Sequence, residues 1–473
     1  MKLNILLPVL AAVGLTSAQR PTSYPPHYFD QPIDHFPHSA RYAPHTKDTF
    51  KQRFFFDSTY YKPGGPVFLY LSGETSGESR FSNLETGTIA DNAYFAQRVS
   101  FPGINVDVSA PGTPWILYGG SLAGAQTAFS VKTYPHILYG GIASSATTKA
   151  LLEYPQWYDP IQRLGPSDCI ASINAIVDNF DALVATKNEK AIQEFKAIFG
   201  LESLSDIRDF AATIAFPLGG PMNYPTNTWQ ELNWYPAYTT DDFFNFCSNV
   251  TNIFAPESIT SVDYALAKYT NGEPWTNLGN YANYFKNVLL PLCDGVEINS
   301  SACFSTQNAT NWAIPANDGS RSYLYSTCTE QGAYQVAPIT GPSLISTVLK
   351  VDYTQDWCNW AFPPGKYNKI PHTPDLSRYN VYGGWDVTAN RLAHIDGATD
   401  VWLDLCYHSH LAPPRYSSDL HPEYLIAGGG HHWDSYGILD INAEPQFIQQ
   451  AHLWEIRTVQ KWLKSFNATG GKF

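Results

Sequence analysis

The chain has 473 residues and a formal net charge of −13, with 44% hydrophobic and only 15% charged residues. This length exceeds what one hydrophobic core usually fills, so we expect one large domain with a second domain or a large insert. The composition is that of a globular protein and excludes a disordered chain. The acidic balance argues against a nucleic-acid partner, because phosphates would be repelled.

The N-terminus has the pattern of a secretory signal. Lys2 supplies a positive charge, residues 6–15 form a short apolar run, and small residues precede Gln19. The run is too short to span a bilayer, so residues 1–18 are predicted to be a cleaved signal peptide. We expect a soluble protein with no membrane association, located outside the cell or in a vacuolar or lysosomal lumen.

Two further features fit an oxidising compartment. Asn-x-Ser/Thr sequons, which are N-glycosylation acceptors, occur at Asn249, Asn299, Asn308 and Asn467. The seven cysteines show neither CxxC pairs nor zinc-ligand spacing, so disulfides are expected and no metal or cofactor is predicted. Because seven is odd, at least one thiol must stay free or pair outside the chain. The cysteines are Cys169, Cys247, Cys293, Cys303, Cys328, Cys358 and Cys406.

Strands and helices alternate in the first part of the chain. Short apolar runs between turn residues predict strands, and helical spacing of apolar residues predicts the elements between them. Such a series is typical of a parallel sheet covered on both faces. The predicted strands are 49–56, 66–71, 114–118 and 140–145, and the predicted helices are 89–99 and 123–134.

The pattern changes after residue 150. Apolar residues at helical spacing over 168–201, followed by polar loops, predict a largely helical insert or cap over 151–345. The sheet domain would then consist of residues 19–150 and 346–473. In its second part we expect strands at 379–382 and 424–427 and an amphipathic helix at 446–466.

The strongest local signal is Tyr118-Gly119-Gly120-Ser121-Leu122-Ala123-Gly124, between a predicted strand and a predicted helix. A nucleophile elbow requires this context, with small residues around a serine held on a strained turn. Ala123 stands where a second glycine is usual. Ser121 is the predicted nucleophile; the alternative is a passive serine in a glycine-rich turn.

A serine nucleophile needs a histidine base oriented by an acid, in the chain order Ser, Asp or Glu, His. Asp386 follows the predicted strand 379–382 and a Gly-Gly turn, and His431 follows the strand 424–427 and three glycines. His432 comes next, and the pattern does not separate the two histidines. A capping aspartate and a surface histidine are the alternatives, and His394, His408, His410 and His421 are interpreted as having no catalytic part.

Candidate oxyanion donors are the Leu122 N–H and an N–H of Gly73 or Glu74, which end the strand 66–71. A turn with a solvated glutamate is an equal alternative for the second donor. Trp385 and Trp433 flank the predicted acid and base, and their faces suit a proline ring. They are at least as well explained as core residues.

An ordered set of motifs resembles the family of lysosomal Pro-Xaa carboxypeptidase and dipeptidyl peptidase II, with secreted fungal members closest. The resemblance implies an α/β-hydrolase fold with a helical insert, and cleavage of peptides or proteins next to proline. It implies Ser121 as nucleophile, Asp386 as acid, His431 as base and Glu330 near the substrate, and it leaves a homodimer open. The motifs are Gly119-Gly120-Ser121-Leu122-Ala123-Gly124, Ala143-Ser144-Ser145-Ala146, Cys328-Thr329-Glu330, Gly383-Gly384-Trp385-Asp386 and Gly430-His431-His432-Trp433-Asp434.

One stretch departs from the family. Between Gly77 and Ile89 the chain lacks a strand and an acidic-x-Arg-aromatic-Tyr-Gly motif that family members carry beside the site. A missing strand would leave backbone groups of the sheet unpaired.

Taken together, the motifs predict a secreted serine-type peptidase of the carboxypeptidase, dipeptidyl peptidase or endopeptidase type. The alternatives are an esterase or lipase with the same triad, or a catalytically impaired glycoprotein.

Overall fold

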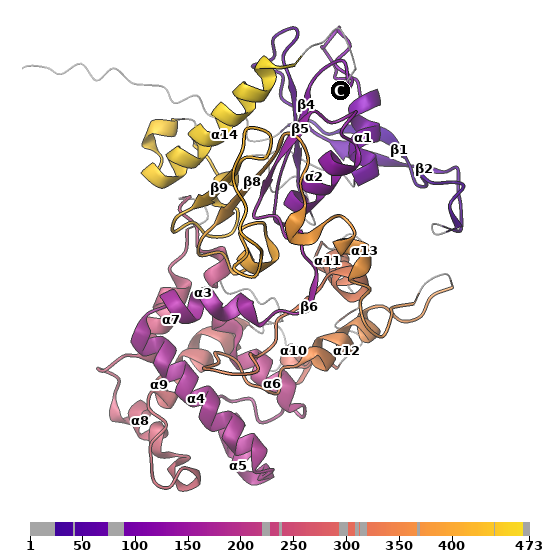
Figure 1. Cartoon of the computed structure of the whole chain (residues 1–473). Coiled ribbons are helices and arrows are strands. Elements are labelled where there is room, and N and C mark those ends of the chain that lie inside the picture. The colour runs from indigo at the N-terminus through magenta and orange to yellow at the C-terminus, as the bar shows by residue number, and fades with distance from the viewer. Residues whose placement is uncertain are drawn as a thin grey trace, which may run out of the picture.

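The computed structural model describes residues 24–40, 43–73, 89–219, 228–235, 239–292, 301–307, 312, 319–366, 369–438 and 440–466. Figure 1 shows a sheet domain above and a helical body below. The predicted signal peptide, Glu74 and the sequons at Asn299, Asn308 and Asn467 lie outside the described residues. Among the described residues, no helix is both long and apolar enough to cross a bilayer.

A five-stranded parallel sheet forms the upper domain, in the order β3-β4-β5-β8-β9. Its strands confirm the expected parallel arrangement. Because the strands are parallel, their carboxyl ends all meet at one edge of the sheet, where loops can bring distant residues together. The strands are β3 (Val67–Leu71), β4 (Trp115–Gly120), β5 (Gly140–Ser144), β8 (Leu392–Gly397) and β9 (Glu423–Ile426).

Helices cover both faces of this sheet (Figure 1). Helices α1 (Ile89–Arg98) and α2 (Ser121–Thr133) pack on one face, where they share a core with Trp115 and Leu117 of β4. Helix α14 (Gln446–Lys464) packs on the other face, in a core that contains Ile116. This alternation along β4 follows from the two-residue period of a strand.

Two predictions in the second part of the sheet domain need correction. Residues 379–382, expected as a strand, form the end of the short helix α13 (Ser377–Asn380) and the turn after it. Strand β8, which the sequence pattern did not predict, lies inside the sheet between β5 and β9 instead. Its buried His394 and Asp396 interrupt the apolar run by which a central strand is recognised. The other predicted elements differ from the observed ones by only a few residues.

Strand β3 is the edge strand of the sheet and pairs directly with β4, so no strand is missing between them. The shortening between Gly77 and Ile89 therefore leaves β3 at an edge rather than opening a gap inside the described sheet. Phe68 of β3 is 61% exposed there. A separate antiparallel hairpin is made of β1 (His27–Pro32) and β2 (Thr49–Phe54).

The lower body is helical and has its own aromatic-rich core. It joins the sheet domain near the small parallel ribbon of β6 (Leu151–Glu153) and β7 (Gly332–Tyr334) (Figure 1). Its helices are α3 (Asp159–Leu164), α4 (Ser167–Ala185), α5 (Glu189–Ile198), α6 (Ile207–Ile214), α7 (Asp242–Val250), α8 (Glu257–Thr260), α9 (Leu278–Tyr284), α10 (Ser301–Phe304), α11 (Gly319–Ser326) and α12 (Val351–Ala361).

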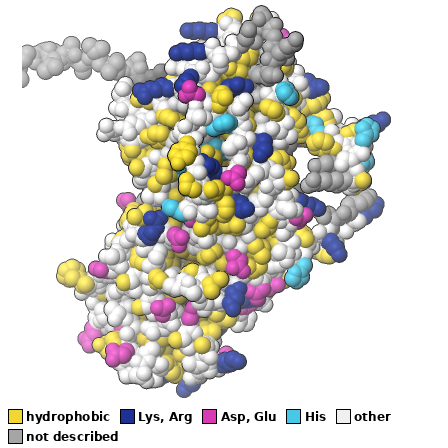
Figure 2. Space-filling view, in the orientation of Figure 1, with side chains coloured by type: hydrophobic (Ala, Val, Ile, Leu, Met, Phe, Trp, Pro, Cys, Tyr) yellow, Lys and Arg dark blue, Asp and Glu magenta, His cyan; other side chains and the backbone are white. Residues whose placement is uncertain are grey.

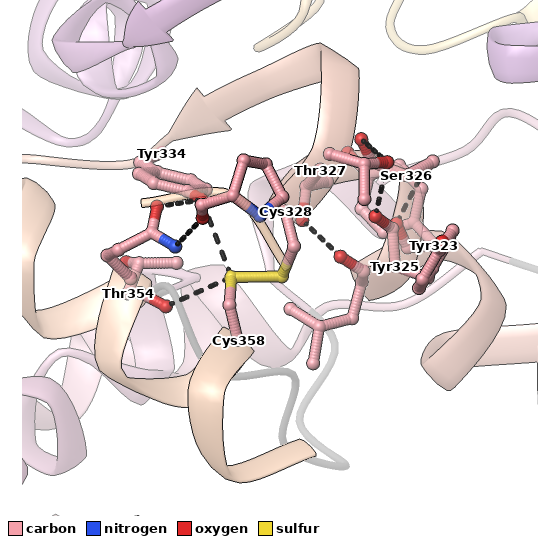
Figure 3. Close-up of a disulfide and its surroundings, with 12 residues drawn as sticks. Tyr323, Tyr325, Ser326, Thr327, Cys328, Tyr334, Thr354 and Cys358 are labelled. Carbon is pink, nitrogen blue, oxygen red and sulfur yellow. Dashed lines mark hydrogen bonds between the residues drawn. A yellow bond between two sulfur atoms is a disulfide. The ribbon is translucent and has the colours of Figure 1, made fainter. Parts of the chain in front are cut away.

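Disulfides confirm the expected use of the cysteines. Cys169 in α4 is bonded to Cys247 in α7, and Cys328 is bonded to Cys358 in α12. Figure 3 shows the second bond beside Tyr334, whose hydroxyl lies 3.5 Å from the Cys358 sulfur. Cys406 is buried with a free thiol, as the odd number of cysteines requires.

Candidate active site

Ser121 lies on a strained turn between β4 and α2. Its φ of +58° is in the left-handed region that side chains other than glycine rarely adopt. A Cβ on Gly119 would lie 2.3 Å from the Ala123 carbonyl oxygen, and one on Gly124 would lie 2.6 Å from the Ser144 carbonyl oxygen. Both glycines are therefore required for the turn and for the packing of α2 against β5. The structure has the elbow geometry that the motif predicts.

His431 is the histidine beside this serine. Its Nε2 lies 2.8 Å from Ser121 Oγ, in the loop that follows β9. His432 makes a different contact, because its backbone N–H donates to Ser145 Oγ at 2.9 Å and its φ is +41°. The two neighbouring histidines, which the local pattern did not distinguish and of which the resemblance implied His431, are thus separated by their contacts.

Asp400 is the carboxylate that contacts this histidine. Asp400 Oδ2 lies 2.8 Å from His431 Nδ1, and the backbone N–H of Trp402 donates to Asp400 Oδ1 at 2.8 Å. The Asp400 side chain has no exposed surface. A buried carboxylate fixed in this way can hold the imidazole in one orientation and stabilise the imidazolium that forms when it takes a proton.

Asp386, which the sequence predicted as the orienting acid, is not in contact with His431, and Asp400 lies there instead. Asp386 is exposed, on a short 3-10 turn (Gly384–Asp386) before β8 rather than after it. The neighbouring Tyr382 stacks on Phe129 of α2 at 4.4 Å between ring centroids. Phe129 lies two turns along α2 from Ser121, so this segment packs on the body of the helix and not at its N-terminal end.

Sequence reasoning missed Asp400 because it missed β8. A usable signal was present: the run Leu392-Ala393-His394-Ile395-Asp396-Gly397 ends in glycine, and Asp400 follows it within three residues. The required chain order of serine, acid and histidine holds for Asp400 as it does for Asp386.

The loops that carry the acid and the base are joined backbone to backbone. The N–H and hydroxyl of Thr399 both donate to the Gly429 carbonyl oxygen at 2.9 Å. A Cβ on Gly397 would lie 2.2 Å from the Gly430 carbonyl oxygen. The distance between Asp400 and His431 is therefore set by close packing of two glycine-containing turns.

The candidate oxyanion donors meet at the start of α2. Leu122 is the second residue of that helix, whose N-terminal N–H groups favour negative charge. Gly73 has a φ of +73°, and a Cβ built on it would lie 3.6 Å from the Ala123 backbone nitrogen. The turn after β3 thus lies against the turn that holds Ser121.

The indoles of the two predicted pocket tryptophans donate to backbone carbonyl oxygens. Trp385 Nε1 donates to Asp404 at 3.0 Å, and Trp433 Nε1 donates to Leu232 of the helical body at 2.7 Å. Glu330 is half-buried in the turn Thr327–Gln331, where it lies within electrostatic range of Tyr379.

A buried network of acidic residues lies between the loop that carries His431 and the sheet. Asp434 accepts hydrogen bonds from Tyr118 at 2.5 Å and from Ser144 at 2.7 Å. Burial raises the pKa of Asp434, and burial next to Asp434 raises the pKa of Glu455 in α14 well above its ordinary value. His452 Nε2 lies 2.9 Å from the Asp434 carbonyl oxygen, and its Nδ1 lies 2.8 Å from Glu444. This network attaches the base loop to β4, β5 and α14.

A parallel sheet with a serine on its strand–helix elbow and a histidine and an aspartate on later loops defines a serine hydrolase of the α/β-hydrolase type. The profile of the family described as serine carboxypeptidase S28 matches residues 31–97 and 82–446. The chain belongs to this family of serine-type peptidases.

Named relatives agree with this assignment. A probable extracellular serine carboxypeptidase of Arthroderma benhamiae is 32% identical over 503 residues, which cover 93% of this chain and 68% of that protein. A serine protease of Bipolaris victoriae is 26% identical, over 90% of this chain and 87% of that protein. The thymus-specific serine protease of Homo sapiens is 21% identical, over 75% and 73% of the two chains.

The alignment with the Arthroderma benhamiae protein spans 503 residues, more than the 473 of this chain. That relative therefore carries segments that this chain lacks. Among solved structures, a feruloyl esterase B from Aspergillus oryzae is 11% identical with a TM-score of 0.19, covering 90% of this chain and 86% of that one. A superposition at that score supports no argument about fold or function.

Proposed function

We propose that Ser121, His431 and Asp400 form the catalytic triad of a secreted peptidase that cleaves next to proline. The observation that carries the proposal is the hydrogen-bonded chain from Ser121 Oγ through both ring nitrogens of His431 to Asp400. The strained backbone at Ser121 supports it, because strain of this kind collects at functional sites.

In this mechanism Ser121 Oγ attacks the scissile carbonyl carbon while His431 Nε2 takes the hydroxyl proton. Asp400 stabilises the resulting imidazolium. The Leu122 N–H and the Gly73 turn bind the oxyanion. His431 then gives its proton to the leaving amine, which breaks the C–N bond and leaves an acyl group on Ser121. Water, deprotonated by His431, hydrolyses this ester and frees Ser121.

Secretion and glycosylation are part of the proposal. The N-terminal signal pattern and two disulfides between described residues suit an oxidising compartment. Asn249 is exposed on α7, where a glycan can be attached without displacing the core. The name of the Arthroderma benhamiae relative includes the word extracellular.

The triad is tested with Ser121→Ala, and with Ser172→Ala on helix α4 as the control. Both proteins are assayed on matched peptides with and without proline before the scissile bond, and are labelled with a fluorophosphonate probe. We expect Ser121→Ala to lose at least about 10³-fold in kcat and all labelling, and Ser172→Ala to behave as the unaltered protein. Retained hydrolysis in Ser121→Ala would disprove the nucleophile.

The position of cleavage is tested with one proline-containing peptide in three forms: free at both ends, amidated at the C-terminus, and acetylated at the N-terminus. Loss of cleavage only on amidation indicates carboxypeptidase action, and loss only on acetylation indicates aminodipeptidase action. Cleavage of all three forms indicates an endopeptidase. Equal rates on peptides without proline would contradict the proline preference, and hydrolysis of acyl esters alone would indicate an esterase.

A further inference from the structure

One segment of the helical body contacts both catalytic loops. Residues 228–235, here called the bridging segment, hydrogen-bond to the acid loop (residues 398–402) and to the base loop (residues 427–435). The three pieces come from distant parts of the sequence and belong to different bodies of the molecule. Four tryptophan indoles make these contacts. None of the four indoles takes part in the proposed mechanism.

On the acid side, two hydrogen bonds hold the loop that carries Asp400. Trp229 Nε1 donates to the Thr399 carbonyl oxygen at 3.0 Å, and Trp402 Nε1 donates to Gln230 Oε1 at 3.1 Å. Trp402 is also the residue whose backbone N–H donates to Asp400 Oδ1. The bridging segment therefore contacts this loop on both sides of Asp400, at Thr399 and at Trp402.

On the base side, two more hydrogen bonds form a reciprocal pair. Trp433 Nε1 donates to the Leu232 carbonyl oxygen at 2.7 Å, and Trp234 Nε1 donates to the Trp433 carbonyl oxygen at 2.9 Å. Trp433 is two residues from His431. Tyr235 adds a stacked contact with Tyr436, at 5.9 Å between ring centroids.

The bridging segment is itself fixed. Glu231 Oε2 accepts hydrogen bonds from the Thr228 backbone N–H at 3.0 Å and from its hydroxyl at 2.6 Å, which closes a capping box around one helical turn. Trp229 is 9% exposed and packs edge-on against Phe243 of α7, at 5.3 Å between ring centroids. A segment held in this way can set the separation of two loops, because it does not move freely with either one.

We propose that the bridging segment is a positioning element of the active site: through Gln230–Trp402 and Trp234–Trp433 it fixes the loops of Asp400 and His431 relative to each other. The inference rests on the proposed triad and extends it from the sheet domain to the helical body. Misplacement by about 1 Å far from the chemistry can cost about 100-fold in rate, so a loosened bridge should lower kcat.

The test uses the full-length protein with Gln230→Leu, Trp402→Phe, the double variant and Trp234→Phe. The control is Trp275→Phe in the same body, since the Trp275 indole is buried with no hydrogen-bond partner in the part of the chain that is described. Each protein is assayed for kcat and KM on a proline peptide, for the rate of fluorophosphonate labelling, and for its melting temperature. All assays are run well below the lowest melting temperature.

We expect the two single variants on the acid side to lose about 10- to 100-fold in kcat and in labelling rate, with KM unchanged. The double variant should lose no more than the worse single one, because both changes remove the same bond. Trp275→Phe should keep its kcat. Trp234→Phe tests the base side independently, should an acid-side variant fail to fold.

The proposal is overturned if folded variants keep the kcat of the unaltered protein, or if only KM rises, which would indicate a substrate contact instead. It is also overturned if Trp275→Phe loses as much kcat as the bridge variants. Failure of the triad itself would be distinguishable, because Ser121→Ala would then keep its activity whatever the bridge variants do.

Discussion

Two buried aspartates, one on either side of Gly397, each contact a histidine. Asp396 Oδ2 is 2.7 Å from His408 Nδ1, and Asp400 Oδ2 is 2.8 Å from His431 Nδ1. Neither carboxylate has any exposed side-chain surface. The pairs differ at the other ring nitrogen: His431 Nε2 meets Ser121 Oγ at 2.8 Å, whereas His408 Nε2 faces Glu423 at 3.8 Å.

Burial of an aspartate–histidine pair does not by itself bring a serine to the imidazole. The first pair attaches the segment around His408 to β8, because Asp396 also accepts the His408 backbone N–H at 3.0 Å. The second pair meets a serine because the β4–α2 elbow presents Ser121 at the carboxyl edge of the same sheet. The difference between the two pairs therefore depends on the elbow, and variants of each carboxylate can test it.

The largest effect is expected from removing the charge of one carboxylate at a time. Asp400→Asn should lower kcat by about 10³- to 10⁴-fold, because an amide no longer holds the required imidazole tautomer or stabilises the imidazolium. Asp396→Asn and Asp386→Asn, assayed on the same proline peptide, should keep kcat within a few-fold. Equal losses from Asp396→Asn and Asp400→Asn would remove the distinction between the pairs, and a larger loss from Asp386→Asn would restore the sequence-based assignment.

An intermediate effect is expected from Gly397, the residue between the two pairs. In Gly397→Ala the new Cβ would lie 2.2 Å from one backbone oxygen and 2.4 Å from another, so the acid and base loops must separate. We expect about 1–3 kcal/mol of destabilisation and about 100-fold lower kcat. Gly112→Ala, whose nearest contact would be an ordinary 3.5 Å, is the control for unfolding and activity assays. Unchanged kcat in Gly397→Ala would show that the loops tolerate separation.

The smallest effect is expected in the pH dependence of stability, and it comes from the buried network of Asp434 and Glu455. Burial raises the pKa of Glu455 well above its ordinary value of 4.5, with Asp434 adding to the shift. The folded protein thus keeps a proton that the unfolded chain loses, so unfolding free energy falls as pH rises above about 4.5. Tyr118, Glu444 and His452 are the other titratable groups of this network.

Glu455→Gln should flatten this dependence, so that the variant loses less unfolding free energy than the unaltered protein between pH 4.5 and pH 7.5. Denaturant unfolding at the two pH values measures it, with the exposed Glu257→Gln on α8 as the control. Burial lowers the pKa of His394 to about 3, which acts in the opposite direction but is common to both proteins and cancels in the difference. An equal pH slope in Glu455→Gln and the unaltered protein would contradict the shift.

The elements that could be predicted from the sequence are those with uninterrupted patterns. Strands β3, β4 and β5 and helices α1, α2 and α14 all fall on the expected residues, because apolar periodicity and turn glycines mark them. Strand β8 could not be predicted in this way. His394 and Asp396 are buried within it, where His394 stacks on Tyr407 and Asp396 accepts a hydrogen bond from the His408 backbone. A pattern of apolar residues does not represent polar residues that are buried through tertiary contacts.

The sequence by itself marked Ser121 as the candidate nucleophile. An elbow is local: the glycines at 119 and 124 and the apolar strand before them specify a strained turn within about ten residues, whatever the rest of the chain does. The chain order also placed the acid, an aspartate or a glutamate, between Ser121 and the histidine, and the pattern after strand 424–427 left two adjacent histidines as the base.

Only the tertiary structure showed which aspartate contacts His431, the histidine that the resemblance implies. Asp400 and His431 are 31 residues apart, and each is more than 270 residues from Ser121 in the chain, yet all three meet at one sheet edge. Their meeting depends on the parallel pairing of β5, β8 and β9 and on glycine turns packed backbone to backbone. Contacts of this kind are set by the order of strands in the sheet, which no local pattern around Asp386 or Asp400 encodes.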